Sequence, residues 1–200
     1  MSATVTPETR AFEYALGVFA VLIGLAVADV ATSFHRLARS RYPVAWDPLC
    51  LLAAFYALCL AVGMWFDLWG VRQFAETRHF FFYLWLVALL FVLFLIAADS
   101  LPDEAGEACD LSAHYASNRR YFWTLVVIFQ VGYLLNGLYF IGADLRHLSP
   151  GRSIWLINNM LVPCLLALVL RSVAARWVHY LGVVFLLAGL AFHYASYQIN

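Results

Sequence analysis

The chain alternates between six long apolar segments and short polar ones. Each apolar segment is close to the roughly 20 residues that an α-helix needs to cross about 30 Å of hydrocarbon. The pattern therefore predicts an all-α, polytopic membrane protein with a single transmembrane domain, residues 1–200, and with both termini on the same side of the membrane. The predicted spans are about 12–35, 48–71, 79–99, 121–143, 153–171 and 176–198.

Composition supports this class. Of the 200 residues, 64% are hydrophobic and 12% are charged, which excludes a soluble globular protein. The formal net charge is zero, so no basic excess indicates nucleic acid as a partner. Every cation is an arginine, which excludes lysine Schiff-base chemistry. The four cysteines follow no C-x-x-C spacing and are expected to be packing residues.

The arginines indicate an orientation. Seven lie in the first, third and fifth loops, and five lie on the side of the termini. Short loops rich in arginine stay cytoplasmic, and the dense segment RLARSR follows the first helix, which often dominates topology. The count therefore favours termini outside the cytoplasm.

Small residues form a stripe along the first segment, because at about 100° per residue they fall on one face of a helix. A smooth stripe lets a second helix approach closely. We expect it to pack inside the bundle or, alternatively, to contact another subunit of a homo-oligomer. The stripe consists of Gly17, Ala20, Gly24, Ala28 and Ala31.

Polar side chains within the spans are the candidate functional residues, because they are costly in hydrocarbon and usually face protein or water. Asp29 and Ser33 share a face of the first segment with Arg36, so Asp29 either pairs with Arg36 or serves permeation. The stretch GMWFDLWGV places Trp65 and Trp69 about 40° apart on a helix, with Asp67 opposite them. The tryptophans then suit the headgroup belt, and Asp67 turns inward, at a cavity mouth or in an ion pair between helices.

The fourth and fifth segments carry amides. Gln130 lies on one face of the fourth segment with Asn136 at its margin, and the fifth contains Asn158 and Asn159. Pro163 lacks an N–H and frees a carbonyl about one turn earlier, near Asn159. We expect the two helices to face each other, either through interhelical hydrogen bonds or along a wet path for polar solutes or monovalent ions.

The histidines raise the alternative of a haem-binding redox protein. His179 and His193 are about 21 Å apart along one helix, a spacing that suits two stacked haems, with His35 and His79 as partners. No His/Cys cluster or H-E-x-x-H motif indicates a metal site, and no G-x-S-x-G motif indicates a nucleophile. We therefore expect a non-enzymatic protein without a metal and, outside the haem alternative, without a cofactor.

Several motifs resemble a family of small bacterial integral membrane proteins of unassigned function. They are FEYALGVFAVLIGLAVADV with its Arg-rich loop, the W-x-x-x-W of the second segment, LPD, Asp110 and HYASNRRYFW, within residues 10–125. The resemblance implies a six-helix protein of the bacterial inner membrane and supplies no activity.

The first segment is also distantly similar to the six-helix bacterial and lysosomal potassium channels. Arg10 precedes Gly17-Val18-Phe19-Ala20 by seven residues, as in the Arg and Phe-Ser-Asp-Gly-Val-Phe-Ala pattern of those channels. Ala15 and Leu16 replace the Ser-Asp pair, so the Phe-Ser-Asp motif is missing. The resemblance implies kinship of fold.

Together these patterns predict channel-like permeation of a monovalent cation or small polar solute. An accessory or scaffold subunit of a larger membrane complex is the first alternative, and the haem protein is the second. The expected partners are the lipid bilayer and either further copies of the chain or other membrane subunits. The expected lining residues are Asp29, Ser33, Asp67, Gln130, Asn136, Asn158 and Asn159.

Overall fold

The computed structural model describes residues 7–71, 80–103, 109–141, 153–154 and 156–195, which form a bundle of helices. A one-turn π-helix, η3, leads directly into α6, so these two elements form one continuous helical segment. The helices are α1 (Pro7–Ala38), α2 (Pro48–Val71), α3 (Phe80–Asp99), α4 (Leu111–Ile141), η3 (Ile157–Leu161), α6 (Val162–Ser172) and α7 (Arg176–Ala195).

Five helices within the described residues are long and apolar enough to cross a membrane: α1, α2, α3, α4 and α7. The apolar helix Ile157–Ser172 is shorter than these five. The prediction of an all-α, polytopic membrane protein is confirmed, with five long apolar helices where six spans were predicted. The predicted ends at 142–143 and 196–198 lie outside the described residues.

The fourth helix begins at Leu111, ten residues before the predicted span of 121–143. Asp110 caps its N-terminus, because the Asp110 Oδ1 atom accepts hydrogen bonds from the backbone N–H groups of Ser112 (2.8 Å) and Ala113 (3.2 Å). Leu111 and Tyr115 are buried, one turn apart on the same face. A side-chain cap and a buried face thus extend the helix through a stretch whose polarity suggested a loop.

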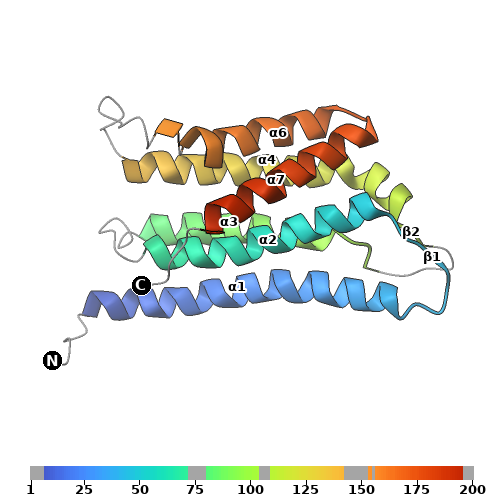
Figure 1. Cartoon of the computed structure of the whole chain (residues 1–200). Coiled ribbons are helices and arrows are strands. Elements are labelled where there is room, and N and C mark those ends of the chain that lie inside the picture. Colours follow the sequence, from blue (N-terminus) through green and yellow to red (C-terminus); the bar gives the residue numbers. More distant parts are fainter. Residues whose placement is uncertain (1–6, 72–79, 104–108, 142–152, 155, 196–200) are drawn as a thin grey trace.

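The helices form two groups, which are joined by the packing of α3 and α2 on α4 and by α7. In Figure 1, α1, α2 and α3 lie side by side below α4 and α6, and α7 crosses from α6 towards α2. The N-terminal end of α1 and the C-terminal end of α7 lie at the same end of the bundle. This placement agrees with the prediction that both termini lie on one side. We call this end of the bundle the terminal end and the other the loop end.

The loop end is held together by polar contacts between the segments that follow α1, α3 and α6. Two short strands, β1 (Val44–Ala45) and β2 (Cys109–Asp110), pair in parallel there. Asp47, 4% exposed, accepts a hydrogen bond from Arg176 Nη2 at 2.5 Å, and Arg176 also donates to Ser112 Oγ. These contacts close the bundle on that side.

The small-residue stripe of α1 faces away from the bundle, so the prediction that it packs inside was wrong for the single chain. Gly17, Gly24, Ala28 and Ala31 are exposed, and Ala20 is half-buried. A Cβ atom at Gly17 or Gly24 would meet no described atom within 4 Å. The opposite face of α1 packs against α2 and α3. This buried face consists of Phe19, Ile23, Ala26, Val30, Ser33 and Leu37.

Candidate functional site

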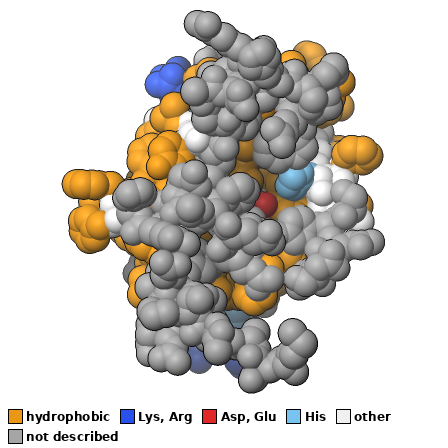
Figure 2. Space-filling view, turned by 90° about the vertical axis from the view of Figure 1, so that its left-hand side faces the viewer, with side chains coloured by type: hydrophobic (Ala, Val, Ile, Leu, Met, Phe, Trp, Pro, Cys, Tyr) orange, Lys and Arg blue, Asp and Glu red, His pale blue; other side chains and the backbone are white. Residues whose placement is uncertain are grey.

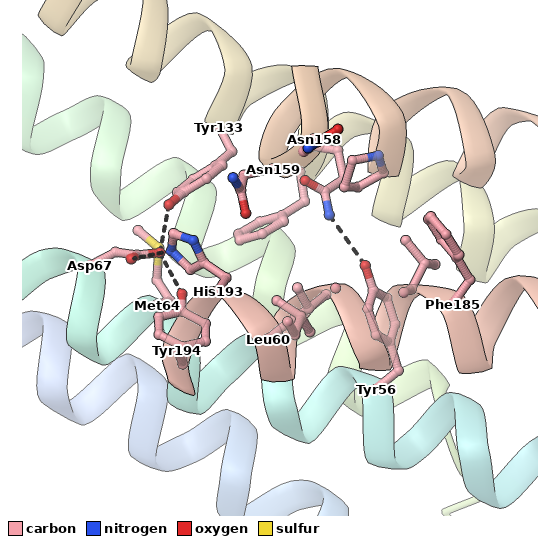
Figure 3. Close-up of a pocket in the computed structure, with 16 residues that line it drawn as sticks. Tyr56, Leu60, Met64, Asp67, Tyr133, Asn158, Asn159, Phe185, His193 and Tyr194 are labelled. Carbon is pink, nitrogen blue, oxygen red and sulfur yellow. Dashed lines mark hydrogen bonds and ion pairs between the residues drawn. The ribbon is translucent and has the colours of Figure 1, made fainter. Parts of the chain in front are cut away.

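A cavity of about 60 Å³ lies between α2, α4, η3, α6 and α7 in the half of the bundle nearer the terminal end. Sixteen described residues line it, most of them apolar or aromatic. Since a cavity needs about 10–15 Å³ of such space to hold one water molecule, this cavity has room for a few water-sized groups. Figure 3 shows Asp67 at one end of the cavity and Tyr56 near the other.

Asp67 is the only acidic residue among the described residues that line the cavity. Its Oδ2 atom accepts hydrogen bonds from the hydroxyls of Tyr133 (2.6 Å) and Tyr194 (2.8 Å). Its Oδ1 atom lies 3.9 Å from Nε2 of His193. The three partners come from α4 and α7, so the carboxylate connects three helices (Figure 3). Both tyrosines donate to the same oxygen, an arrangement that suits a carboxylate anion.

Helical periodicity in α2 places Asp67 inward. Leu60, Met64 and Asp67 lie one turn apart and all line the cavity, whereas Trp65 is 36% exposed on the outer side of the helix. The predicted inward orientation of Asp67 is confirmed. Figure 2 shows the bundle from the terminal end, where an acidic side chain and a histidine lie next to each other near the centre.

Gln130 forms the deeper polar contact of the cavity. Its Nε2 atom donates to the hydroxyl of Tyr56 at 3.2 Å, and both side chains are almost fully buried. Beyond this contact, Tyr56 stacks on Trp123, whose Nε1 atom donates to the Tyr115 hydroxyl at 3.0 Å. The cavity is therefore closed towards the loop end by aromatic rings and satisfied hydrogen bonds.

Asn158 and Asn159 line the cavity from the π-helix η3. The N–H of Val162 bonds to the carbonyl of Ile157, five residues earlier, and Pro163 follows with no N–H to donate. Single π-turns of this kind widen a helix and are frequent at functional sites. The π-helix lies directly before Pro163, where the two amides meet the cavity.

Of the predicted lining residues, the structure brings four together and leaves three outside the cavity. Asp67, Gln130, Asn158 and Asn159 line it, and α4 packs against α6 and η3 as expected. Asn136 is buried but does not line the cavity. Asp29 and Ser33 lie on α1, none of whose described residues borders the cavity.

The predicted pair between Asp29 and Arg36 does not form. Arg36 Nη1 donates instead to the backbone carbonyl of Asp103 at 3.1 Å. The Asp29 Oδ2 atom is buried and has no hydrogen-bond partner among the described residues. Arg36 lies about two helical turns beyond Asp29, beside the segment that follows α3, where the Asp103 carbonyl accepts its hydrogen bond.

The histidines do not fit the haem alternative. His179 is buried, with Nδ1 2.7 Å from the Tyr115 hydroxyl and Nε2 3.0 Å from the Val173 carbonyl, so hydrogen bonds occupy both ring nitrogens. His35 is exposed on α1, and His79 lies outside the described residues. His193 faces a cavity far smaller than the several hundred Å³ that a large planar ligand fills. Within the described part of the chain, no three His, Cys, Asp or Glu side chains gather as a metal site.

Sequence reasoning missed Tyr56 and Tyr194. Each has a hydroxyl that contacts a predicted site residue, but neither belongs to a polar motif in the sequence. The one available signal for Tyr194 was Gly63, four residues before Asp67, whose missing side chain makes room for the Tyr194 ring.

No protein-family model matches the chain, and no curated protein or solved structure is significantly similar to it. The two resemblances noted from sequence motifs therefore gain no support, and function is argued from the site.

Proposed function

We propose that this membrane protein is a non-enzymatic, channel-like protein that binds and passes a monovalent cation or a small polar solute through the cavity beside Asp67. The observation that supports it is the convergence of Asp67 with Gln130, Asn158 and Asn159, from three helical segments, on one cavity within the bundle. Ionisable side chains inside a membrane bundle are rare, and they usually mark ion or substrate pathways.

The chemistry of the lining favours a cation over an anion. Asp67 supplies a carboxylate, the amides and tyrosines supply neutral oxygens, and none of the described lining residues is an arginine. Oxygen-lined paths with little fixed charge suit monovalent cations, because such ions must bind weakly enough to leave again. His193 is the one lining group that would oppose a cation if it were protonated.

The cavity reaches only part of the way across the bundle, so it corresponds to a closed form of the proposed path. The Gln130–Tyr56 hydrogen bond and the rings of Tyr56 and Trp123 stand between it and the loop end. Passage would require these groups to move. We infer that α7 moves most readily, because only 22% of its span is buried.

Flux into liposomes tests the proposal. The full chain is reconstituted, and the fluxes of K⁺, Na⁺ and protons are compared with those of empty vesicles. We expect flux of at least one ion, and we expect Asp67→Asn to lower it while Asp29→Asn, a change of the same kind outside the cavity, leaves it intact. Absence of flux above empty vesicles for all three ions would refute permeation of these cations.

The outward-facing stripe of α1 favours a second candidate, a subunit that assembles with other membrane helices. A homo-oligomer through this stripe would place Gly17 and Gly24 in a helix contact. The mass of the protein particle purified in a mild detergent tests this role. A monomer with no second subunit would contradict it.

We also propose a bacterial inner membrane as the location, with both termini outside the cytoplasm, on the arginine distribution and the family resemblance. A reporter that is active only in the cytoplasm, fused after Asn200, should then be inactive. Activity of that fusion would reverse the orientation.

A further inference from the structure

The cavity opens sideways through an opening that we call the portal, framed by Asn158 on η3 and by Phe185 and Gly189 on α7. All three are exposed; Phe185 is 57% exposed and lies near the middle of the α7 span. A Cβ atom at Gly189 would meet no described atom within 4 Å, so no side chain fills this part of the portal. The middle of a span lies at the depth of the hydrocarbon, so the portal faces lipid tails rather than water.

The two tyrosines beside the carboxylate pack on further aromatic rings. Tyr133 stacks on Phe129 with ring centroids 6.3 Å apart, and Tyr194 packs on Phe66 at 6.0 Å. Both tyrosines also donate to Asp67. A carboxylate in a cavity lined mostly by apolar and aromatic side chains suits an organic ammonium group, because the anion attracts the cation and the lining tolerates its methylenes.

We propose that the cavity binds the head of a lipophilic primary ammonium compound, whose hydrocarbon chain passes through the portal into the bilayer. This inference rests on the proposed function, because both place the ligand in the same cavity. It adds the chemical class of the cation.

The size of the cavity supports this division between head and chain. About 60 Å³ is far below the roughly 300–1,000 Å³ of pockets that enclose drug-sized ligands, so the cavity has room for a small head group and not for a hydrocarbon chain. The rest of the molecule must therefore leave through the portal. The N–H donors of the head can meet Asp67 Oδ1, which lines the cavity and does not accept a hydrogen bond from either tyrosine.

Equilibrium binding of isotopically labelled n-octylammonium to the full chain in lipid nanodiscs tests the proposal, with empty nanodiscs as the background for partition into lipid. We expect saturable binding that n-octanol, which has the same chain and a neutral head, does not displace. Asp67→Asn should weaken binding about 30-fold or more, because it removes the charge that faces the ammonium. Asp29→Asn, outside the cavity, should leave it unchanged.

A second variant keeps the test independent of Asp67. Gly189→Leu narrows the portal, and its Cβ atom would meet no described atom within 4 Å, so we expect a folded protein with binding weakened about tenfold or more. Gly24→Leu, at an equally uncrowded glycine of α1, is the matched control and should bind as the unaltered chain does.

The outcomes separate this inference from the proposed function. Any of three results overturns the inference. Octylammonium does not bind, n-octanol displaces it equally well, or neither Asp67→Asn nor Gly189→Leu weakens its binding. K⁺ flux that depends on Asp67, without octylammonium binding, leaves the proposed function standing and the inference refuted. Octylammonium binding without flux of any inorganic cation supports the ligand class and refutes inorganic permeation.

Discussion

Replacing Gly63 with alanine should displace the Tyr194 ring from its place beside Asp67. A Cβ atom at Gly63 would lie 2.7 Å from both Cε2 and Oη of Tyr194, closer than non-bonded atoms approach. The Tyr194 hydroxyl donates to Asp67 Oδ2 at 2.8 Å. The ring therefore has to move, and this hydrogen bond has to lengthen or break.

The expected loss of stability combines three effects. Overpacking costs about 1–3 kcal/mol, and a hydrogen bond between membrane helices contributes about 0.6 kcal/mol. Alanine offsets about 1 kcal/mol of this, because it favours a helix more than glycine does. We expect Gly63→Ala to lower the free energy of unfolding by about 1–2 kcal/mol.

Reversible unfolding in mixed micelles measures this change. Gly24→Ala is the control, because a Cβ atom there meets no described atom within 4 Å, and it should leave stability unchanged or raise it. In a Tyr194→Ala background the clash is absent, so Gly63→Ala should no longer destabilise. Equal effects of the two glycine variants, or a penalty that persists without the Tyr194 ring, would refute the reasoning.

Three further changes test other parts of the site. Gln130→Leu removes the amide that donates to the buried Tyr56 hydroxyl, so the free energy of unfolding should fall by about 1–3 kcal/mol. Adding Tyr56→Phe should recover part of that loss in the same assay. Pro163→Ala restores a backbone N–H, so we expect η3 to relax towards an α-helix, with slower amide hydrogen exchange there and lower flux. Asp47→Ala removes the buried acceptor of Arg176 and a contact to the first turn of α2. The free energy of unfolding, measured by thermal denaturation, should therefore fall by about 1–3 kcal/mol.

Periodicity predicted which residues share a helix face, and the structure agrees where one face is clearly polar or amphipathic. The angle between Trp65, Asp67 and Trp69 correctly turned Asp67 inward. The amides of Gln130 and Asn159 meet one cavity for the same reason. These predictions depend only on the geometry of single helices.

Periodicity does not determine which neighbour a face meets, and the remaining predictions failed on that point. The α1 stripe and its opposite face are both apolar, so hydropathy could not tell which of them turns inward. The contact between Tyr194 and Asp67 joins residues 127 positions apart and depends on how α7 crosses the bundle. The start of α4 depended on a side-chain cap in a stretch that is polar on average.

The two ends of α2 show why the site lies at the terminal end. Twenty residues separate Asp47 from Asp67, and eighteen separate Arg176 from Tyr194, so both helices cover nearly the same length, about 27–30 Å. At each end a carboxylate of α2 meets a side chain of α7. Asp47 meets an arginine, whose permanent charge neutralises it, whereas Asp67 meets tyrosine hydroxyls, which donate hydrogen bonds without adding charge. Among the described residues, therefore, Asp47 has an arginine as its partner, whereas Asp67, at one end of the cavity, has two tyrosines and a histidine.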